Sequence, residues 1–236
     1  MCNIVDFHSH ILPGIDDGSR SVEESISMLR AEAEQGIRHV VATPHFYAQH
    51  DNVEKFLKRR SEAENRLREA MEKYDDLPEV TVGAEVYFYP NISESNLLNG
   101  LTIGKSRYIL LEMPDVVWTG SMYREMELIL SRQGLTPIIA HVDRYFGRFR
   151  TFGIPEKLEE LPVLVQANAS FFNDQSSRSR AMRMLRNGQI HLLGSDCHNL
   201  HSRRPDLGKA IEKIRDRLGE APLACIEDFQ NQVFNL

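Results

Sequence analysis

The pattern of hydrophobic residues constrains the fold of this chain more than any other feature of its sequence. Short, almost continuously apolar runs alternate with longer amphipathic stretches along the whole chain. Seven runs are expected to form strands: Ile4–Phe7, Val40–Thr43, Val80–Val86, Tyr108–Leu111, Pro137–Ala140, Val163–Ala167 and Ile190–Leu193. Strands that are apolar on both faces are typical of a parallel sheet covered by helices. The pattern therefore predicts a closed or doubly wound α/β fold.

The amphipathic stretches have the period and the end signals of helices. In the first stretch, Ser21 and Glu24 have the spacing of a capping box, and Gly36 supplies a stop. Further helices are expected over Val53–Tyr74, Ser121–Gln133, Ser177–Arg186 and Asp206–Leu218. No linker, low-complexity tract or sequence repeat divides the 236 residues, so we expect a single domain over residues 1–236.

Charge and cysteine content limit the partners and the environment of the chain. A net charge of −6, with acidic and basic residues interspersed, argues against a nucleic-acid-binding surface. No apolar run reaches the roughly 20 residues that span a bilayer, and the start of the chain does not resemble a signal peptide. The 3 cysteines lack the spacing of a disulfide framework. We therefore expect a cytoplasmic protein without membrane insertion, and we leave its oligomeric state open.

Potential metal ligands follow almost every predicted strand. In parallel α/β folds the carboxyl ends of the strands meet at one edge, where ligands bind. Six of the seven strand ends offer His, Asp or Glu, and the remaining one ends at Asn168. The candidates are His8, His10, His45, Glu85, Glu112, His141, Asp196 and His198. Any one of them alone would be an ordinary core or surface residue, but their convergence beside apolar strands favours a metal site.

The local spacing of these candidates also suits metal binding. In His8-Ser9-His10 and in Asp196-Cys197-His198, alternate residues of extended backbone point to the same side, so each stretch offers a pair of ligands. Mixed imidazole and carboxylate ligands suit manganese, iron, zinc or cobalt better than calcium or magnesium. The sequence therefore predicts a cluster of two or three divalent transition-metal cations.

At these residues the sequence resembles the PHP (polymerase and histidinol phosphatase) superfamily. Within it, the chain is most similar to the bacterial manganese-dependent tyrosine-protein phosphatases of capsule and exopolysaccharide synthesis. The matching stretches, in order between residues 6 and 204, are DFHSHILPGIDDGSRSVEES, ATPHF, GAEVYF, YILLEMP, PIIAHVDRY and GSDCHNLHSR. The resemblance implies an α/β fold of the PHP type, a distorted seven-stranded, TIM-like β/α barrel with a trinuclear metal site.

The resemblance also implies roles for individual residues. It implies nine ligands, with Glu85 bridging two cations: His8, His10, Asp17, His45, Glu85, Glu112, His141, Asp196 and His198. Arg144 and Arg203 are implied to bind the phosphate. The implied cation is Mn²⁺, and the implied partner is the phosphotyrosine-bearing tail of a tyrosine autokinase. Residues 113–123, MPDVVWTGSMY, have no residue-by-residue match, so their contacts with substrate stay unassigned.

The charge of such a site indicates the class of substrate. Three divalent cations would carry +6 against −4 from the carboxylates of Asp17, Glu85, Glu112 and Asp196, which leaves about +2 and favours a dianion. A phosphate monoester has this charge, and water activated by the cations would be its nucleophile. Arg144 and Arg203 each offer a planar fork of N–H donors to phosphate oxygens. We therefore expect a metal-dependent phosphomonoester hydrolase, in particular a protein-tyrosine phosphatase.

Three other functions are compatible with the sequence. The same site could hydrolyse histidinol phosphate or another small phosphomonoester, because fold alone does not fix the substrate. Cys197-x5-Arg203 has the spacing of cysteine-dependent phosphatases, although no glycine lies between the two residues to let backbone amides wrap a phosphate. A non-enzymatic module with structural metals is the third, although structural sites usually have four ligands and no open position.

Several residues near the site have two possible roles. Asp143 is a candidate proton donor or an orienting partner of Arg144, and Asp6 a candidate orienting residue or a plain polar start of a strand. Aromatic residues in the rim loops either stack on a substrate ring or pack the loops: Phe46, Tyr47, Trp118, Tyr123, Tyr145, Phe146 and Phe149. The remaining histidines, His39, His50, His191 and His201, are expected not to bind metal.

Overall fold

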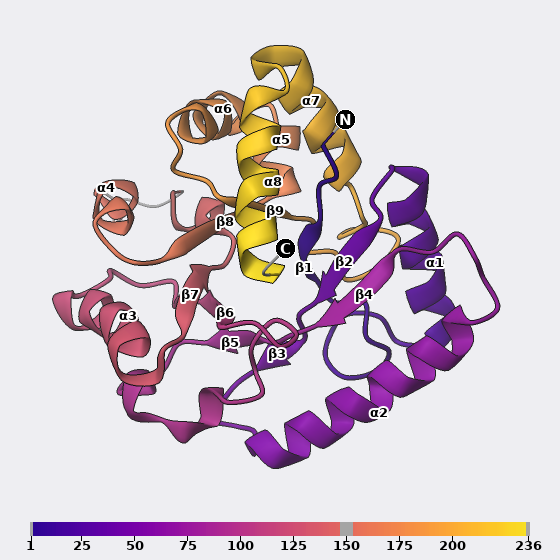
Figure 1. Cartoon of the computed structure of the whole chain (residues 1–236), viewed down its shortest axis with the longest axis horizontal. Helices are drawn as coiled ribbons and strands as arrows, with labels where there is room; N and C mark the ends of the chain where they lie inside the picture. Colours follow the sequence, from indigo (N-terminus) through magenta and orange to yellow (C-terminus); the bar gives the residue numbers. More distant parts are fainter. Residues whose placement is uncertain (1, 147–152, 235–236) are drawn as a thin grey trace.

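The computed structural model describes residues 2–146 and 153–234 of the chain. Within these residues every strand pairing is parallel, as the apolar runs predict. The strands are β1 (Asp6–Ser9), β2 (His39–Ala42), β3 (His45–Phe46), β4 (Glu79–Val82), β5 (Glu85–Tyr87), β6 (Tyr108–Glu112), β7 (Thr136–Ile139), β8 (Leu164–Asn168) and β9 (Leu192–Gly194). The molecule is therefore an α/β protein with a parallel sheet, curled around a central axis (Figure 1).

The strands form two sheets that continue into one another. The orders are β1-β2-β4 and β3-β5-β6-β7-β8-β9. Gly83 N donates to Ala42 O at 2.8 Å and Glu85 N donates to Pro44 O at 3.0 Å, so pairing passes from β2 and β4 to β3 and β5 across a bend. The single strand predicted over Val80–Val86 is wrong, because the chain bends at residues 83–84 and forms two strands.

The first strand lies beside the last one. Ser9 forms a parallel bridge with Cys197, His10 N donates to Cys197 O at 2.9 Å, and Asp196 N donates to His8 O at 2.7 Å. These contacts join the free edge of β1 to the end of β9. Residues from the two ends of the chain therefore meet at the same edge of the curled sheet.

Most of the helices surround the outside of the sheet (Figure 1). The helices are α1 (Val22–Glu34), α2 (Val53–Met71), α3 (Gly120–Gln133), α4 (Ile154–Glu159), α5 (Ala169–Asn173), α6 (Arg178–Arg186), α7 (Leu207–Leu218) and α8 (Ala221–Phe234), with short 3₁₀ turns η1 (Ile92–Glu94), η2 (Asn96–Leu98) and η3 (Val142–Phe146). The five predicted helices correspond to α1, α2, α3, α6 and α7. The sequence analysis missed α8 and the short helices α4 and α5. None of the helices in the described residues is long and apolar enough to cross a membrane.

The capping box predicted at the start of α1 forms only in part. The Ser21 hydroxyl accepts a hydrogen bond from Glu24 N at 3.2 Å, as predicted. The Glu24 carboxylate, however, accepts from Arg20 N at 2.9 Å and not from Ser21 N. Both contacts still satisfy backbone donors near the first turn, so α1 begins where the sequence indicates.

Helix α8 covers the end of the curled sheet at which the strands begin (Figure 1). The buried side chain of Gln230 accepts from Val5 N and donates to Asn3 O, both at 2.9 Å. The ring of Phe234 lies 5.3 Å from that of Phe7. Apolar residues from the strands fill the space behind α8 and leave only the opposite end of the sheet for polar groups.

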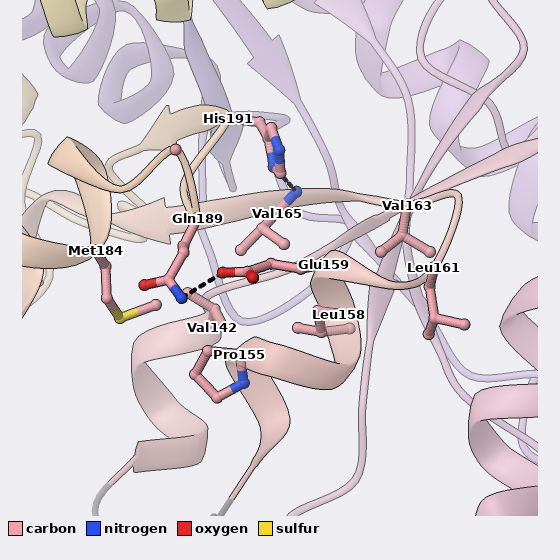
Figure 2. A pocket seen from close by; sticks show the side chains of 11 residues that line it. Val142, Pro155, Leu158, Glu159, Leu161, Val163, Val165, Met184, Gln189 and His191 are labelled. Carbon is pink, nitrogen blue, oxygen red and sulfur yellow. Dashed lines mark hydrogen bonds between the residues drawn. The ribbon is translucent and has the colours of Figure 1, made fainter.

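A separate pocket of about 210 Å³ lies outside the sheet, between α4 and the loop before β9. Most of the residues that line it have apolar side chains, and the side chains of Glu159 and Gln189 form a hydrogen bond within it (Figure 2). His191 Nδ1 accepts a hydrogen bond from Val165 N at 3.0 Å. None of the nine predicted metal ligands lines this pocket.

Candidate metal centre

The nine predicted ligands all lie near the carboxyl ends of the strands. His8 lies within β1, His45 and Glu85 begin β3 and β5, and Glu112 ends β6. The other five lie in the segments that follow β1, β7 and β9: His10, Asp17, His141, Asp196 and His198. Among the nine, only the side chain of Asp17 is largely exposed, at 66%.

A first group of ligand atoms, from His8, His10 and Glu85, has the spacing of a coordination shell, and Asp196 lies beside it. His8 Nε2 lies 3.3 Å from Glu85 Oε2 and 3.5 Å from Asp196 Oδ1. His10 Nε2 lies 3.2 Å from His8 Nε2 and 3.5 Å from the same two oxygens. Four ligands about 2.1 Å from one cation in a tetrahedron would lie about 3.4 Å apart. The group therefore fits one divalent cation.

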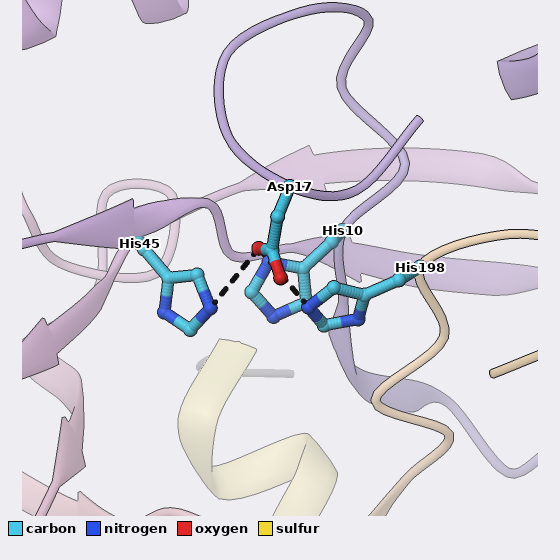
Figure 3. Close-up of side chains that lie close together, drawn as sticks. All are labelled: His10, Asp17, His45 and His198. Carbon is cyan, nitrogen blue, oxygen red and sulfur yellow. Dashed lines mark ion pairs between the residues drawn. The ribbon is translucent and has the colours of Figure 1, made fainter. Parts of the chain in front are cut away.

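A second group lies beside the first and contains His10, Asp17, His45 and His198 (Figure 3). Their ligand atoms all lie within 4.8 Å of one another. Asp17 Oδ1 lies 3.5 Å from His45 Nε2 and 3.4 Å from His198 Nε2. The loop after β1 thus places an exposed carboxylate over three imidazoles, which is the mixed donor set of a transition-metal site.

A third group comprises His45, Glu85 and Glu112, with His141 beside them. Glu85 Oε2 lies 2.9 Å from His45 Nδ1, and Glu85 Oε1 lies 2.8 Å from His141 Nε2. His141 Nε2 is also 3.6 Å from Glu112 Oε1. Glu85 belongs to both the first and the third group, which is the position that a carboxylate bridging two cations would need.

Two of the predicted ligands have unusual backbone conformations. His141 has φ 32° and Asp196 has φ 54°, a region that residues other than glycine rarely adopt. Neighbouring hydrogen bonds hold both segments: His141 N donates to Gln166 Oε1 at 2.6 Å, and Ser195 N donates to Asp6 Oδ1 at 2.8 Å. Backbone strain of this kind clusters at functional sites, where the surroundings fix it.

The sequence analysis missed two residues that orient the ligands, Asp16 and Gln166. Asp16 Oδ2 accepts from His10 Nδ1 at 2.7 Å and from His45 N at 3.1 Å. Gln166 Oε1 accepts from His141 N and lies 3.3 Å from His8 Nδ1. Asp16 could have been identified only from its position next to the candidate ligand Asp17. Gln166 could have been identified as a polar residue within an apolar strand.

The close packing of these groups shifts their pKa values strongly. Burial lowers the pKa of His10, but the hydrogen bonds and charges of Asp16 and Glu85 together outweigh this effect and raise the pKa to about 10. Burial and the nearby charge of Glu85 raise the pKa of Glu112 to about 7. Cations would compete with protons for these side chains, so their binding is expected to release protons.

Arg144 and Arg203 lie at the rim of the centre, where the phosphate was expected. Arg144 contacts Asp196 Oδ2 and lies 3.7 Å from Glu112 Oε1, and Arg203 Nη2 lies 2.7 Å from Asp196 Oδ1. Both guanidinium groups are more than a third exposed, and both line an open cavity of about 620 Å³. The cavity thus connects the candidate metal centre with solvent and has three arginine side chains on its wall, those of Arg144, Arg203 and Arg204.

Cys197 is unsuited to act as a nucleophile. Its side chain is fully buried near the carboxyl groups of Asp6 and Glu32 and does not line the cavity that Arg203 lines. Burial and the two carboxyl groups raise the pKa of the thiol well above its ordinary value. A cysteine nucleophile needs a lowered pKa and access to substrate, so the geometry disfavours the cysteine-dependent alternative.

The structure also gives the positions of Asp143 and of several aromatic residues near the rim. Asp143 Oδ1 accepts from Asn168 N at 2.9 Å, and burial raises its pKa to about 6. Tyr47 lies beside His45, with ring centroids 5.3 Å apart. Phe46 and Trp118 are buried in the core, and Phe149 lies outside the described residues.

Among the four histidines that were expected not to bind metal, His39 and His191 contact α8 at the other end of the sheet.

A curled parallel α/β sheet with a cluster of imidazoles and carboxylates at its carboxyl edge defines a metal-binding α/β protein. The family described as "Capsular polysaccharide synthesis, CpsB/CapC" matches residues 4–231. The tyrosine-protein phosphatase CpsB of Streptococcus pneumoniae is 31% identical over 235 residues, which cover 92% of this chain and 91% of that protein. The chain therefore belongs to the CpsB/CapC family.

Two further comparisons agree with this assignment. The tyrosine-protein phosphatase YwqE of Bacillus subtilis (strain 168) is 28% identical over 236 residues, which cover 95% of this chain and 89% of that protein. A structure from the work on YwqE and on CpsB from S. pneumoniae, described as metal-dependent tyrosine phosphatases, superposes with a TM-score of 0.85 at 24% identity. This match covers 98% of this chain and 95% of that structure, and shows that the fold is shared.

Proposed function

We propose that this protein is a metal-dependent protein-tyrosine phosphatase that acts in capsule or exopolysaccharide synthesis. One observation carries the proposal: nine histidine and carboxylate side chains meet at one end of the sheet, beside a cavity lined by Arg144, Arg203 and Arg204. Family membership supports it, because the curated relatives CpsB and YwqE are named tyrosine-protein phosphatases.

The proposed roles divide the site into a metal-binding part and a phosphate-binding part. The three groups around Glu85 would hold two or three cations, which supply Lewis acidity toward water and phosphate when bound. Arg144 and Arg203 would bind and orient the phosphate oxygens from the cavity side. A tyrosine leaving group has a pKa near 10 and needs less protonation than an alkoxide, so no dedicated acid is required.

Manganese is the cation that we propose, with iron, zinc and cobalt as alternatives. Five histidines among nine candidates suit any of these ions better than calcium or magnesium. The proposed substrate is a phosphotyrosine-bearing protein, namely the tail of a tyrosine autokinase. Histidinol phosphate or another small phosphomonoester is the alternative substrate, because the same fold hosts several chemistries.

We also propose that the sheet functions as one distorted seven-stranded barrel within a single PHP-type domain. If β2 and β3 are counted as one bent strand, and β4 and β5 as another, the barrel has seven strands. The bridge between Ser9 and Cys197 supports the closure of this barrel. The three cysteines are unpaired, which supports the proposed cytoplasmic location.

Turnover of defined substrates tests the proposal. The manganese-loaded protein should hydrolyse a phosphotyrosine peptide faster than a phosphoserine peptide or histidinol phosphate, and EDTA should abolish turnover. Glu85→Gln should lose activity, whereas Cys197→Ser and the exposed control Asp76→Asn should keep it. Preference for histidinol phosphate would favour the alternative substrate. Activity that survives EDTA but is lost in Cys197→Ser would overturn the mechanism.

A further inference from the structure

A second cluster of acidic groups is buried beneath the candidate metal centre, between α1 and the edge where β1 meets β9. It consists of Asp6, Glu32 and Cys197, whose side chains are all 0% exposed. Their oxygen and sulfur atoms lie within 4.8 Å of one another. Glu32 comes from the inner face of α1, and none of the three was predicted to bind metal.

Asp6 connects two strands that carry predicted ligands. Its Oδ1 accepts from His8 N at 3.1 Å and from Ser195 N at 2.8 Å. His8 is itself a predicted ligand, and Ser195 precedes Asp196, whose backbone has a positive φ. The carboxylate of Asp6 thus fixes the backbone of β1 relative to the segment after β9. Charged acceptors of this kind make strong hydrogen bonds.

The other oxygens of this acidic pair lack ordinary partners. Within the described residues, no backbone amide or basic side chain donates to Asp6 Oδ2 or to either oxygen of Glu32. The carboxyl groups of Asp6 and Glu32 lie together in the buried cluster, with ligand atoms within 4.8 Å of each other. Two buried carboxylates cannot both stay charged without a cation, so one of them must be neutral.

We propose that Glu32 is a positioning residue of the metal centre, whose carboxyl group shares a hydrogen bond with the carboxyl group of Asp6. The Oδ1 atom of Asp6 already accepts two backbone N–H groups, so the oxygens without partners, Asp6 Oδ2 and those of Glu32, are left to interact with each other. Glu32 then fixes the orientation of Asp6, and Asp6 fixes His8 and Ser195. Burial and the charge of Asp6 raise the pKa of Glu32 well above its ordinary value, which agrees with a protonated acid.

Substitutions of Glu32 separate this role from plain packing. A glutamine side chain would keep an N–H donor in nearly the same shape, so Glu32→Gln should bind Mn²⁺ within about threefold of the wild type. Glu32→Leu removes the donor but keeps most of the volume, and its Mn²⁺ affinity should fall roughly 10- to 100-fold, as for other residues that support ligands. The exposed residue Glu34 on the same helix provides the control variant Glu34→Gln.

Isothermal titration with Mn²⁺ gives the affinity and the number of bound ions, and circular dichroism verifies that each variant is folded. Equal weakening in Glu32→Gln and Glu32→Leu would overturn the proposal, as would wild-type affinity in a folded Glu32→Leu. Loss of one bound ion in Glu32→Gln would instead make the cluster a metal site and also overturn it. If Glu32→Leu does not fold, the comparison rests on Glu32→Ala.

This inference rests on the proposed metal binding but not on the identity of the substrate. Affinity is measured without substrate, so inactivity of the wild type toward phosphotyrosine would reject the proposed function and leave the role of Glu32 intact. Conversely, a phosphatase with unchanged Mn²⁺ affinity in Glu32→Leu would retain the proposed function and lose this inference.

Discussion

At the scale of single residues, the candidate centre depends on side chains that touch ligands as well as on the ligands themselves. Asp16 holds His10 and the backbone of His45, and Gln166 holds His8 and the backbone of His141. Such partners fix the orientation of an imidazole ring and its tautomer. Their removal should therefore weaken metal binding without removing a ligand.

Substitution of Asp16 tests this expectation. In Asp16→Ala, the His10 ring loses its 2.7 Å partner, and Mn²⁺ affinity and phosphatase turnover should both fall roughly 10- to 100-fold. Titration calorimetry and a phosphotyrosine peptide assay measure the two effects. Asp76→Ala, at an exposed position, should match the wild type. Unchanged affinity in Asp16→Ala would show that His10 is oriented by other contacts.

Gly194 allows two polar side chains to approach the last strand closely. A Cβ at this position would lie 2.6 Å from His8 Cβ and 2.8 Å from Gln166 Nε2. Gly194→Ala should therefore displace His8, lower stability by about 1–3 kcal/mol and weaken Mn²⁺ binding. Chemical denaturation and calorimetry measure both. Gly120→Ala, where no atom lies within 4 Å of the added methyl group, is the matched control and should behave as the wild type.

At the scale of elements, α8 closes the end of the sheet opposite the candidate metal centre, and two neutral histidines lie against it. His191 packs on Phe229 with ring centroids 4.6 Å apart, and His39 packs on Phe234 at 4.7 Å. Burial lowers the pKa of His191 to about 4 and also lowers that of His39. Protonation of these histidines at acid pH should therefore weaken the packing of α8 against the sheet.

The sign of the pH effect follows from the folded pKa of His191. The folded protein keeps this ring neutral down to about pH 4, whereas the unfolded chain takes up a proton near pH 6.5. The neutral ring contributes up to about 3 kcal/mol to the free energy of unfolding above pH 6.5, and this contribution is lost as the pH falls toward 4. Urea denaturation of the metal-free protein should show this loss. In His191→Asn, which keeps an acceptor for Val165 N, the free energy of unfolding should depend less steeply on pH. An identical dependence on pH would show that His191 does not cause the loss of stability.

The sequence predicts the repeating elements well and the bends poorly. The apolar runs place most strands, because burial on both faces leaves a clear signature. The division of residues 80–86 depends on how two sheets meet, which no local pattern encodes. Helix α8 was missed although it contributes Val233 to the packing inside the sheet. Its place is set by contacts with distant strands.

In the candidate site, too, local sequence patterns predict some residues, whereas others are identified only by their contacts with distant parts of the chain. The nine predicted ligands lie together because the ends of parallel strands converge, and most follow an apolar run directly. Asp16 and Glu32 are different. Glu32 belongs to a run of acidic residues on α1 that reads as a solvated surface, and only its packing against Asp6 and Cys197 reveals its burial.

At the scale of the whole molecule, the predicted ligands come from both sheets. β1 contributes to the three-stranded sheet, whereas β3, β5 and β6 belong to the six-stranded one, and the segment after β9 completes the centre. Bound cations would therefore link the two sheets and stabilise the folded chain relative to the unfolded one.

Metal-dependent stability checks this expectation. Mn²⁺ at 100 times its Kd should raise the free energy of unfolding by about 2.7 kcal/mol per independent site and increase the Tm. Differential scanning calorimetry with Mn²⁺ and with EDTA measures the difference. Glu85→Gln should lose most of this gain, because Glu85 belongs to two ligand groups. A Tm that does not respond to Mn²⁺ would show that the side chains do not bind it.

The pairing of β1 with the segment after β9 has a consequence for folding during synthesis. His8 and His10 are made almost two hundred residues before their backbone partners Asp196 and Cys197. Such distant pairing makes ring closure slow. The growing polypeptide must therefore carry the two histidines without their backbone partners until the segment after β9 has been translated, and a nascent chain that stops before β9 has no complete centre.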